Sequence, residues 1–247
     1  MLQEDLSIAT FATPFALREL CIGEKGTSPK LDHPMDVQVF HIRMANSAGM
    51  REKASLLIRK MYGWRGYSVE PSELAEANKV TLYAETGGVV VGTMSLCMDS
   101  GTPLPADDNF GDKLAELRRQ GRRLCEPSRL AIDKGVTKRV FGALIHISYI
   151  YSHNIHGCND YIIEVNPRHV MFYKRMLGFS DFGGERPCTR VGAPAVLLRL
   201  PLSEMGAQIR RWGGAMELHG EERSFYPYFF PADDEPGITE RLRAGRN

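Results

Sequence analysis

The 247-residue sequence lacks a charge excess, since 31 Lys and Arg face 30 Asp and Glu, for a formal net charge of +1. Proteins that bind nucleic acid usually carry a basic excess, so nucleic acid is not expected as the main partner. The sequence also lacks a run of about 18 apolar residues, and no membrane-spanning segment is predicted. The first twenty residues contain Glu4, Asp5 and Glu19 but no uninterrupted apolar stretch, so no signal peptide is evident. These absences predict a cytoplasmic protein.

Paired cysteines are absent as well. The five cysteines are scattered and form no CxxC pair, which argues against a zinc site or a disulfide framework and favours free thiols: Cys21, Cys97, Cys125, Cys158 and Cys188. Three histidines, His146, His153 and His156, fall on one predicted helix at i, i+7 and i+10. No carboxylate joins them at ligand spacing, so no metal site is predicted.

Alternation and helical periodicity divide the chain into strands and helices. Strands are predicted at 37–44, 80–84, 89–98, 124–133, 161–165 and 195–200, and helices at 47–62, 111–120, 137–156, 169–177 and 203–216. Glu85–Gly88 is typical of a hairpin turn, whereas a strand followed by a long helix and another strand implies a parallel pair. The predicted fold is therefore α/β with a mixed sheet. We expect an N-terminal arm (1–35), one domain (36–202) and a C-terminal helix with an aromatic tail packed on that domain (203–247).

The stretch Leu124–Asp133 is a buried strand interrupted by polar residues, and the long helix follows it directly. Glu126 and Ser128 share one face by strict alternation, while Arg129 points the other way. Pro127 has no N–H for a ladder, so we expect a bulge or a splayed strand here, which would reset the alternation. Polar groups at the end of a strand that feeds a helix predict a site of chemistry.

The segment Asp160–Phe179, DYIIEVNPRHVMFYKRMLGF, resembles the last strand and helix of the GNAT acyltransferase superfamily. The shared features are the strand, an Asn just after it, Phe-Tyr in a short helix, and Gly-Phe at its end. The order of predicted elements from about residue 37 to residue 200 also resembles that fold. The resemblance implies a GNAT-like sheet, mostly antiparallel, with a central splayed parallel pair.

A second segment, CEPSRLAI (Cys125–Ile132), resembles the Glu-x-Ser-Arg signature of the autoinducer (acyl-homoserine lactone) synthases and, more closely, that of the related N-acyl amino acid synthases. This resemblance implies transfer of a long-chain acyl group from acyl carrier protein to the α-amine of an amino acid. No tightly bound cofactor is implied, and acyl-phosphopantetheine or acyl-CoA is the co-substrate. CoA-dependent relatives carry a glycine-rich pyrophosphate loop between this strand and helix. The stretch AIDKGVTKRVFGA here lacks that spacing, which favours a carrier protein as donor.

Amide formation from a thioester needs a base for the amine and an acid for the leaving thiolate. Glu126 is the predicted base, and the resemblance implies that Tyr173 protonates the thiolate. Ser128, Arg129 and Asn166 are predicted to bind substrate, although Arg129 could equally be an ion-pair partner and Asn166 a helix cap. Each of these residues could instead have a purely structural role, in a strand, in the hydrophobic core or as a helix cap.

Acyl carrier proteins are acidic, so a docking face should be basic. Two groups of basic residues flank the predicted site strand, and from them we predict carrier or phosphopantetheine contacts at Arg122, Arg123, Lys138 and Arg139. A run of charge can also be no more than a solvated face. Two other functions remain open: an acyl-homoserine lactone synthase, and a non-catalytic module that binds acyl groups or carrier protein.

Overall fold

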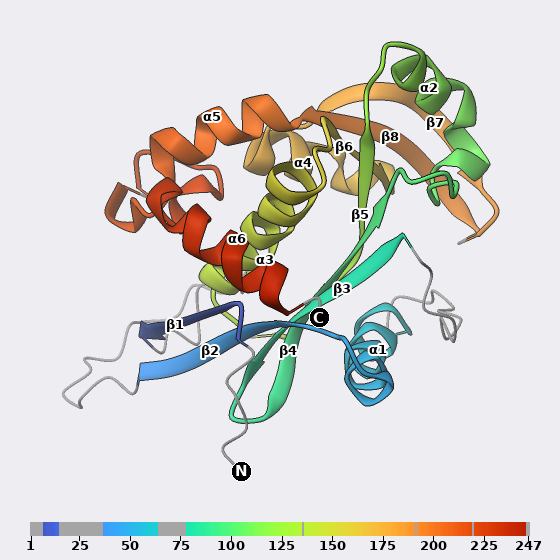
Figure 1. Cartoon of the computed structure of the whole chain (residues 1–247). Coiled ribbons are helices and arrows are strands. Elements are labelled where there is room, and N and C mark those ends of the chain that lie inside the picture. The colour runs from blue at the N-terminus through green and yellow to red at the C-terminus, as the bar shows by residue number, and fades with distance from the viewer. Residues whose placement is uncertain are drawn as a thin grey trace, which may run out of the picture.

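The computed structural model describes residues 7–14, 37–63, 78–134, 136–190, 192–218 and 220–245. Eight strands form one sheet in the order β1-β2-β3-β4-β5-β6-β8-β7 (Figure 1). Only β5 and β6 run parallel, and every other neighbouring pair is antiparallel. The strands are β1 (Ala9–Pro14), β2 (Val37–Met44), β3 (Lys79–Thr86), β4 (Val89–Met98), β5 (Leu124–Ile132), β6 (Asp160–Val165), β7 (Ser180–Cys188) and β8 (Ala193–Pro201).

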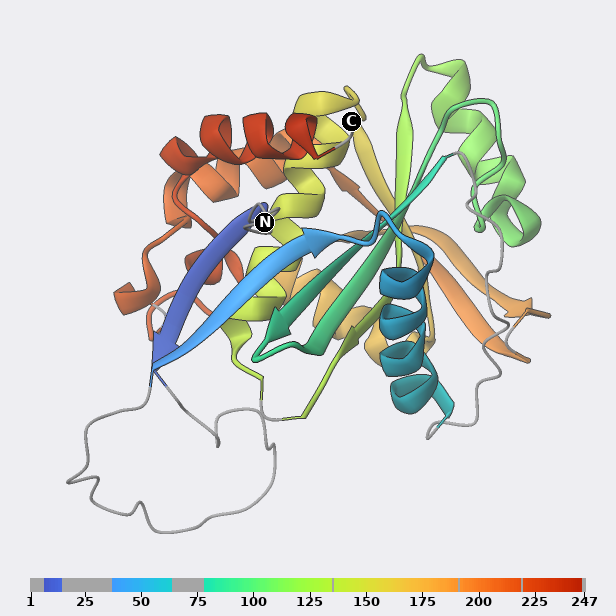
Figure 2. The ribbon, with the colours of Figure 1, turned by 60° about the horizontal axis from the view of Figure 1, so that its bottom comes forward.

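Helices cover both faces of this mixed sheet (Figure 2). One face packs against α1 (Ala48–Gly63) and α2 (Asp107–Arg119), and the other packs against α3 (Lys138–Tyr149), α4 (Val170–Leu177), α5 (Leu202–Trp212) and α6 (Glu235–Ala244). The last turns of the α3 helix widen into a π-helix, Ile150–Ile155. None of the helices in the described ranges is long and apolar enough to cross a membrane.

The predicted elements are confirmed for most of the central chain. Ser47 caps α1 as expected, because its hydroxyl accepts a hydrogen bond from the Met50 amide at 3.3 Å. The hairpin between β3 and β4 and the long helix after β5 also lie where they were predicted. The α2 helix begins a turn earlier than predicted, because the Asp107 carboxylate accepts the Leu104 amide at 2.7 Å and so orders the loop before it.

Two strands and one α-helix of the described ranges were not predicted. The β7 strand contains Gly183, Gly184 and Pro187, which are depleted in strands, so its pattern was obscured. The β1 strand arises in the predicted N-terminal arm and pairs with β2 at the edge of the sheet. The α6 helix follows the aromatic tail, where no further helix was expected. Of the predicted N-terminal arm (1–35), only residues 7–14 lie within the described ranges.

The C-terminal segment packs closely on α3. The buried imidazole of His146 accepts the Phe230 amide at Nδ1 (3.1 Å) and lies 3.1 Å from the Glu235 carboxylate through Nε2. At Gly142 a Cβ atom would lie 2.7 Å from the Tyr228 carbonyl oxygen, so only glycine permits this approach. The aromatic tail is therefore part of the core.

Candidate active site at the β5–β6 splay

The parallel strands β5 and β6 are paired only at their beginning. Leu124 lies opposite Asp160 and Cys125 opposite Tyr161, and beyond these positions the two strands form no ladder with each other. On its other edge β5 bulges against β4, since the register passes from Ser95↔Ser128 to Thr93↔Ala131. Both the bulge and the splay predicted from Pro127 are confirmed.

Arg129 is the residue at which the bulge is made. Its φ is +51°, in the left-handed region that side chains other than glycine rarely adopt. Backbone strain of this kind collects at functional sites, where the surrounding structure holds it in place. The bulge therefore reorients the side chains of β5 just where the strand leaves β6.

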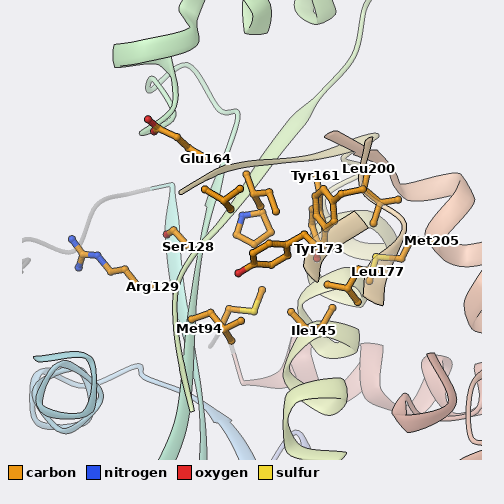
Figure 3. Close-up of a pocket in the computed structure, with 15 residues that line it drawn as sticks. Met94, Ser128, Arg129, Ile145, Tyr161, Glu164, Tyr173, Leu177, Leu200 and Met205 are labelled. Carbon is orange, nitrogen blue, oxygen red and sulfur yellow. The ribbon is translucent and has the colours of Figure 1, made fainter. Parts of the chain in front are cut away.

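A cavity of about 110 Å³ occupies the opening between the strands (Figure 3). Its polar end is formed by Ser128, Arg129 and Glu164, and its inner end by apolar side chains from β6, α4, β8 and α5. Tyr173 of α4 lies between the two ends, with its hydroxyl on the side of Ser128 (Figure 3). The ring packs edge-on against Phe179, with centroids 5.9 Å apart. Such a cavity suits a ligand with a polar head and an apolar tail.

Glu126 lies behind this cavity, on the face of the sheet that α2 covers, and it is not among the residues that line it. Glu126 is 3% exposed, and its carboxylate accepts a hydrogen bond from the Ala106 backbone amide at 2.8 Å. Burial raises the pKa of Glu126 to about 8, although the Ala106 hydrogen bond and Arg190 oppose the shift. A carboxyl group with this pKa can exchange a proton with an amine near neutral pH.

Glu164 is a second carboxylate at the site, and sequence reasoning missed it. It lines the cavity from β6 and contributes to the raised pKa of Glu126 through charge repulsion. Its two oxygens accept hydrogen bonds from the side-chain amide of Asn109, at 3.0 Å, and from the Arg190 guanidinium. The acid in YIIEV could have indicated it. In the sequence, however, Glu164 resembles any polar residue of a strand, because the separation of β5 and β6 is visible only in the structure.

The remaining predicted site residues fall in two places. Asn166 caps the 3-10 turn that precedes α4, since its side-chain oxygen accepts the Arg168 amide at 3.2 Å, and its amide nitrogen donates to the Pro194 carbonyl at 3.4 Å. The structural reading of Asn166 as a cap is thus confirmed. Ser128 and Arg129, by contrast, both line the cavity.

The four basic residues predicted to contact a carrier do not form one surface. Arg122 and Arg123 precede β5, so they lie at the closed end of the strand pair, and Arg122 is bound to buried Asp160 at 2.5 and 2.8 Å. Lys138 and Arg139 begin α3, past the other end of β5. The Arg139 guanidinium is turned inward, where it donates to the carbonyls of Tyr228 (2.7 Å) and Phe229 (2.5 Å). Lys138 is half-buried, with its ammonium 5.5 Å from the Tyr228 ring centroid.

Two of the three histidines of the long helix contact neighbouring segments of the chain. His146 joins the tail, as described above, and the His153 imidazole Nδ1 lies 2.7 Å from the Cys158 carbonyl oxygen. Within the ranges that the structure describes, no group of three potential metal ligands comes together.

Comparison with known proteins identifies the family. Residues 53–201, more than half of the chain, match the model of the family described as N-acyl amino acid synthase FeeM. The chain belongs to the FeeM family of N-acyl amino acid synthases. It is an N-acyltransferase. The match begins within α1 and ends at Pro201, the last residue of β8, so α5, the aromatic tail and α6 follow the matched region.

The chain is also similar to several solved structures. The structure of FeeM, an N-acyl amino acid synthase from uncultured soil microbes, has a TM-score of 0.61 and 26% identity, covering 69% of this chain and 94% of that chain. The AHL synthase LasI has a TM-score of 0.45 and 16% identity (66% and 90% covered), and an N-acetyltransferase from Staphylococcus aureus Mu50 has 0.48 and 10% (66% and 98% covered). No curated protein sequence matches the chain.

Proposed function

We propose that this member of the FeeM family transfers a long-chain acyl group from acyl carrier protein to the α-amine of an amino acid. The observation that carries the proposal is the cavity at the splay, which joins a polar end to a closed apolar end. The pantetheine amides would run between the unpaired edges of β5 and β6, and the acyl chain would lie against the apolar inner wall. A short acyl group would leave that wall uncovered, which favours a longer donor.

The residues proposed for the reaction lie on both faces of the sheet. The amine nitrogen attacks the thioester carbon, its proton passes to a carboxylate, and the C–S bond breaks as the thiolate leaves. Glu126 is the proposed base, because its pKa of about 8 matches that of an α-amine near ~8. Glu164 is the rival base, because it is a carboxylate residue among those that line the cavity. Tyr173, at the middle of the cavity, is the proposed acid for the thiolate.

Arg129 is the proposed binding group for the acceptor's α-carboxylate. Its guanidinium points away from Tyr173, out of the cavity (Figure 3). Within the described part of the chain, Arg129 has no ion-pair partner. An arginine held in a strained conformation beside a polar cavity, with no partner of its own there, suits the carboxylate of a substrate. Ser128 is proposed to contact substrate at the same end of the cavity.

The proposed donor surface lies at the start of α3, where Lys138 supplies positive charge. Exposed Met171 and Phe172 of α4 add an apolar surface, and Phe172 meets Phe141 of α3 at 6.2 Å between ring centroids. An acidic carrier protein fits a surface that is basic and apolar together. Arg122, Arg123 and Arg139 are weaker proposals for this contact, because their positions or internal bonds direct them elsewhere.

A turnover assay tests the function. Purified protein is mixed with acyl carrier protein loaded with a long-chain acyl group and with pooled amino acids, and products are identified by mass spectrometry. We expect an N-acyl amino acid, and a higher kcat/KM with the carrier protein than with the matching acyl-CoA. An acyl-homoserine lactone formed from S-adenosylmethionine would replace this proposal by the autoinducer synthase alternative. Absence of any acylated product, with folding intact, would favour a binding module.

A further inference from the structure

The inner end of the cavity is built partly from the segment beyond the family match. Met205, on α5, lines the cavity together with Leu177 of α4 and Leu200 of β8 (Figure 3). Met205 is fully buried, and the two leucines are each 2% exposed. Met205 lies on the side of Tyr173 opposite Ser128 and Arg129 (Figure 3). An acyl chain that enters past Tyr173 would thus end against this methionine.

The surface at this end is apolar although a tyrosine belongs to it. The Tyr161 hydroxyl is hydrogen-bonded to Ser148 at 2.8 Å and to Ser152 at 3.2 Å, both buried residues of the long helix. With its hydroxyl engaged, Tyr161 offers the cavity mainly its ring. A terminal methyl group would meet only carbon and sulfur atoms there, so its burial is favourable at every added methylene until space runs out.

The helix that carries Met205 is fixed in place. The Leu202 amide donates to the Asn159 carbonyl at 2.8 Å, which ties the start of α5 to the loop before β6. At Gly206 a Cβ atom would lie 2.6 Å from the Tyr149 hydroxyl oxygen, so glycine allows α5 to approach the long helix closely. The position of the Met205 backbone is therefore set by packing, and only its side chain can adapt.

We infer that Met205 limits the length of the acyl chain that this enzyme accepts, so that α5 makes the length selection. The inference rests on the proposed function, since it concerns the acyl donor of the same site. The ligand class is a thioester with a linear saturated chain, and the residue acts by contact with the end of that chain. A smaller side chain at position 205 should admit longer donors, and a larger one should exclude those that the wild type prefers.

The test compares Met205→Ala and Met205→Phe with wild type over a panel of acyl thioesters that increase in steps of two methylenes. Each buried methylene is worth a factor of about 4, so Met205→Ala should raise relative kcat/KM by about 16-fold for donors one step, or two methylenes, longer. Met205→Phe should move the preference in the opposite direction. Ile209→Ala is the control, because Ile209 is buried on the same helix but does not line the cavity.

A second readout separates failure of this inference from failure of the proposed function. Thermal-shift titration with acyl-pantetheine thioesters of the same lengths reports cavity length without turnover. Chain-length preferences that are the same in wild type and in the folded Met205 variants, by both readouts, would overturn the inference. The other outcome is that the Met205 variants bind thioesters of the expected different lengths from wild type, while wild type acylates no amino acid. That outcome would overturn the proposed function and leave the role of Met205 supported. Should Met205→Ala fail to fold, Met205→Phe alone decides by the direction of its shift.

Discussion

The β5–β6 strand pair contains two buried carboxylates with opposite surroundings. Asp160, at the closed end, is fully buried and accepts hydrogen bonds from both Arg122 and Arg199. Glu126 lies just past the point where the strands part, and its carboxylate accepts a hydrogen bond from one backbone amide, that of Ala106. The two arginines tie the Asp160 carboxylate, and with it the start of β6, to the neighbouring segments, whereas burial without such an arginine pair raises the pKa of Glu126 to about 8. The comparison indicates that the paired end of the two strands, at Asp160, serves stability, and that the end where they part, near Glu126, serves the reaction.

Removal of the Asp160 carboxylate should give the largest loss of stability. Asp160→Asn leaves Arg122 and Arg199 without their shared partner, and we expect the free energy of unfolding to fall by about 3 kcal/mol. Denaturant unfolding measures this change. Asp181→Asn is the matched control, since Asp181 pairs with Lys174 at an exposed position and its loss should have no measurable effect. Equal stability of the two variants would contradict a structural role for the closed end.

Glu126 should make stability depend on pH in the opposite sense to a paired carboxylate. Burial raises its pKa from 4.5 to about 8, so the stability contributed by its protonated form is fully present below pH 4.5 and is lost as pH rises through about 8. Relative to Glu126→Gln, the wild type should lose roughly 1.4 kcal/mol for each pH unit across that interval. Parallel stability curves for the two proteins would show that Glu126 is ionised as easily in the folded chain as in the unfolded one.

Replacement of Arg129 should change stability less than the variants above, and it should affect stability and substrate binding in opposite directions. Arg129→Gly removes the left-handed strain, so the free energy of unfolding should stay the same or rise by about 1 kcal/mol. The same change removes the proposed carboxylate contact, so KM for the amino acid should rise about 10-fold while kcat changes less. Steady-state kinetics with the acceptor varied measures both constants. A loss of stability with unchanged KM would show that Arg129 has a structural role and does not bind the substrate carboxylate.

Much of this site could be predicted from local sequence, and the missing parts depend on distant contacts. Pro127 predicts the bulge because a missing N–H is a local property of the chain. Glu164 looked ordinary because its meaning depends on β6 parting from β5, which no pattern within β6 reveals. Met205 belonged to a helix predicted only to pack, since the helical period says nothing of which cavity a side chain reaches.

The same limit applies to the residues predicted for the docking face. Arg122 and Arg139 are charged residues beside the site strand in sequence, which makes them attractive as carrier contacts. In space one is bound to Asp160, and the other is enclosed by the aromatic tail, with its guanidinium 4.6 Å from the Phe230 ring centroid. Asp160 and Phe230 are both distant in sequence from the arginines that they bind, so only the tertiary structure shows these pairs.

Acyl transfer by Glu126→Gln, beside Glu164→Gln as its matched partner, tests the central claim most directly. The account predicts that Glu126→Gln keeps its fold and loses about 10²- to 10⁴-fold in kcat, because the amine proton no longer has its acceptor. Glu164→Gln should retain substantially more activity. Wild-type turnover by folded Glu126→Gln would contradict the account, and a large loss confined to Glu164→Gln would move the base from β5 to β6.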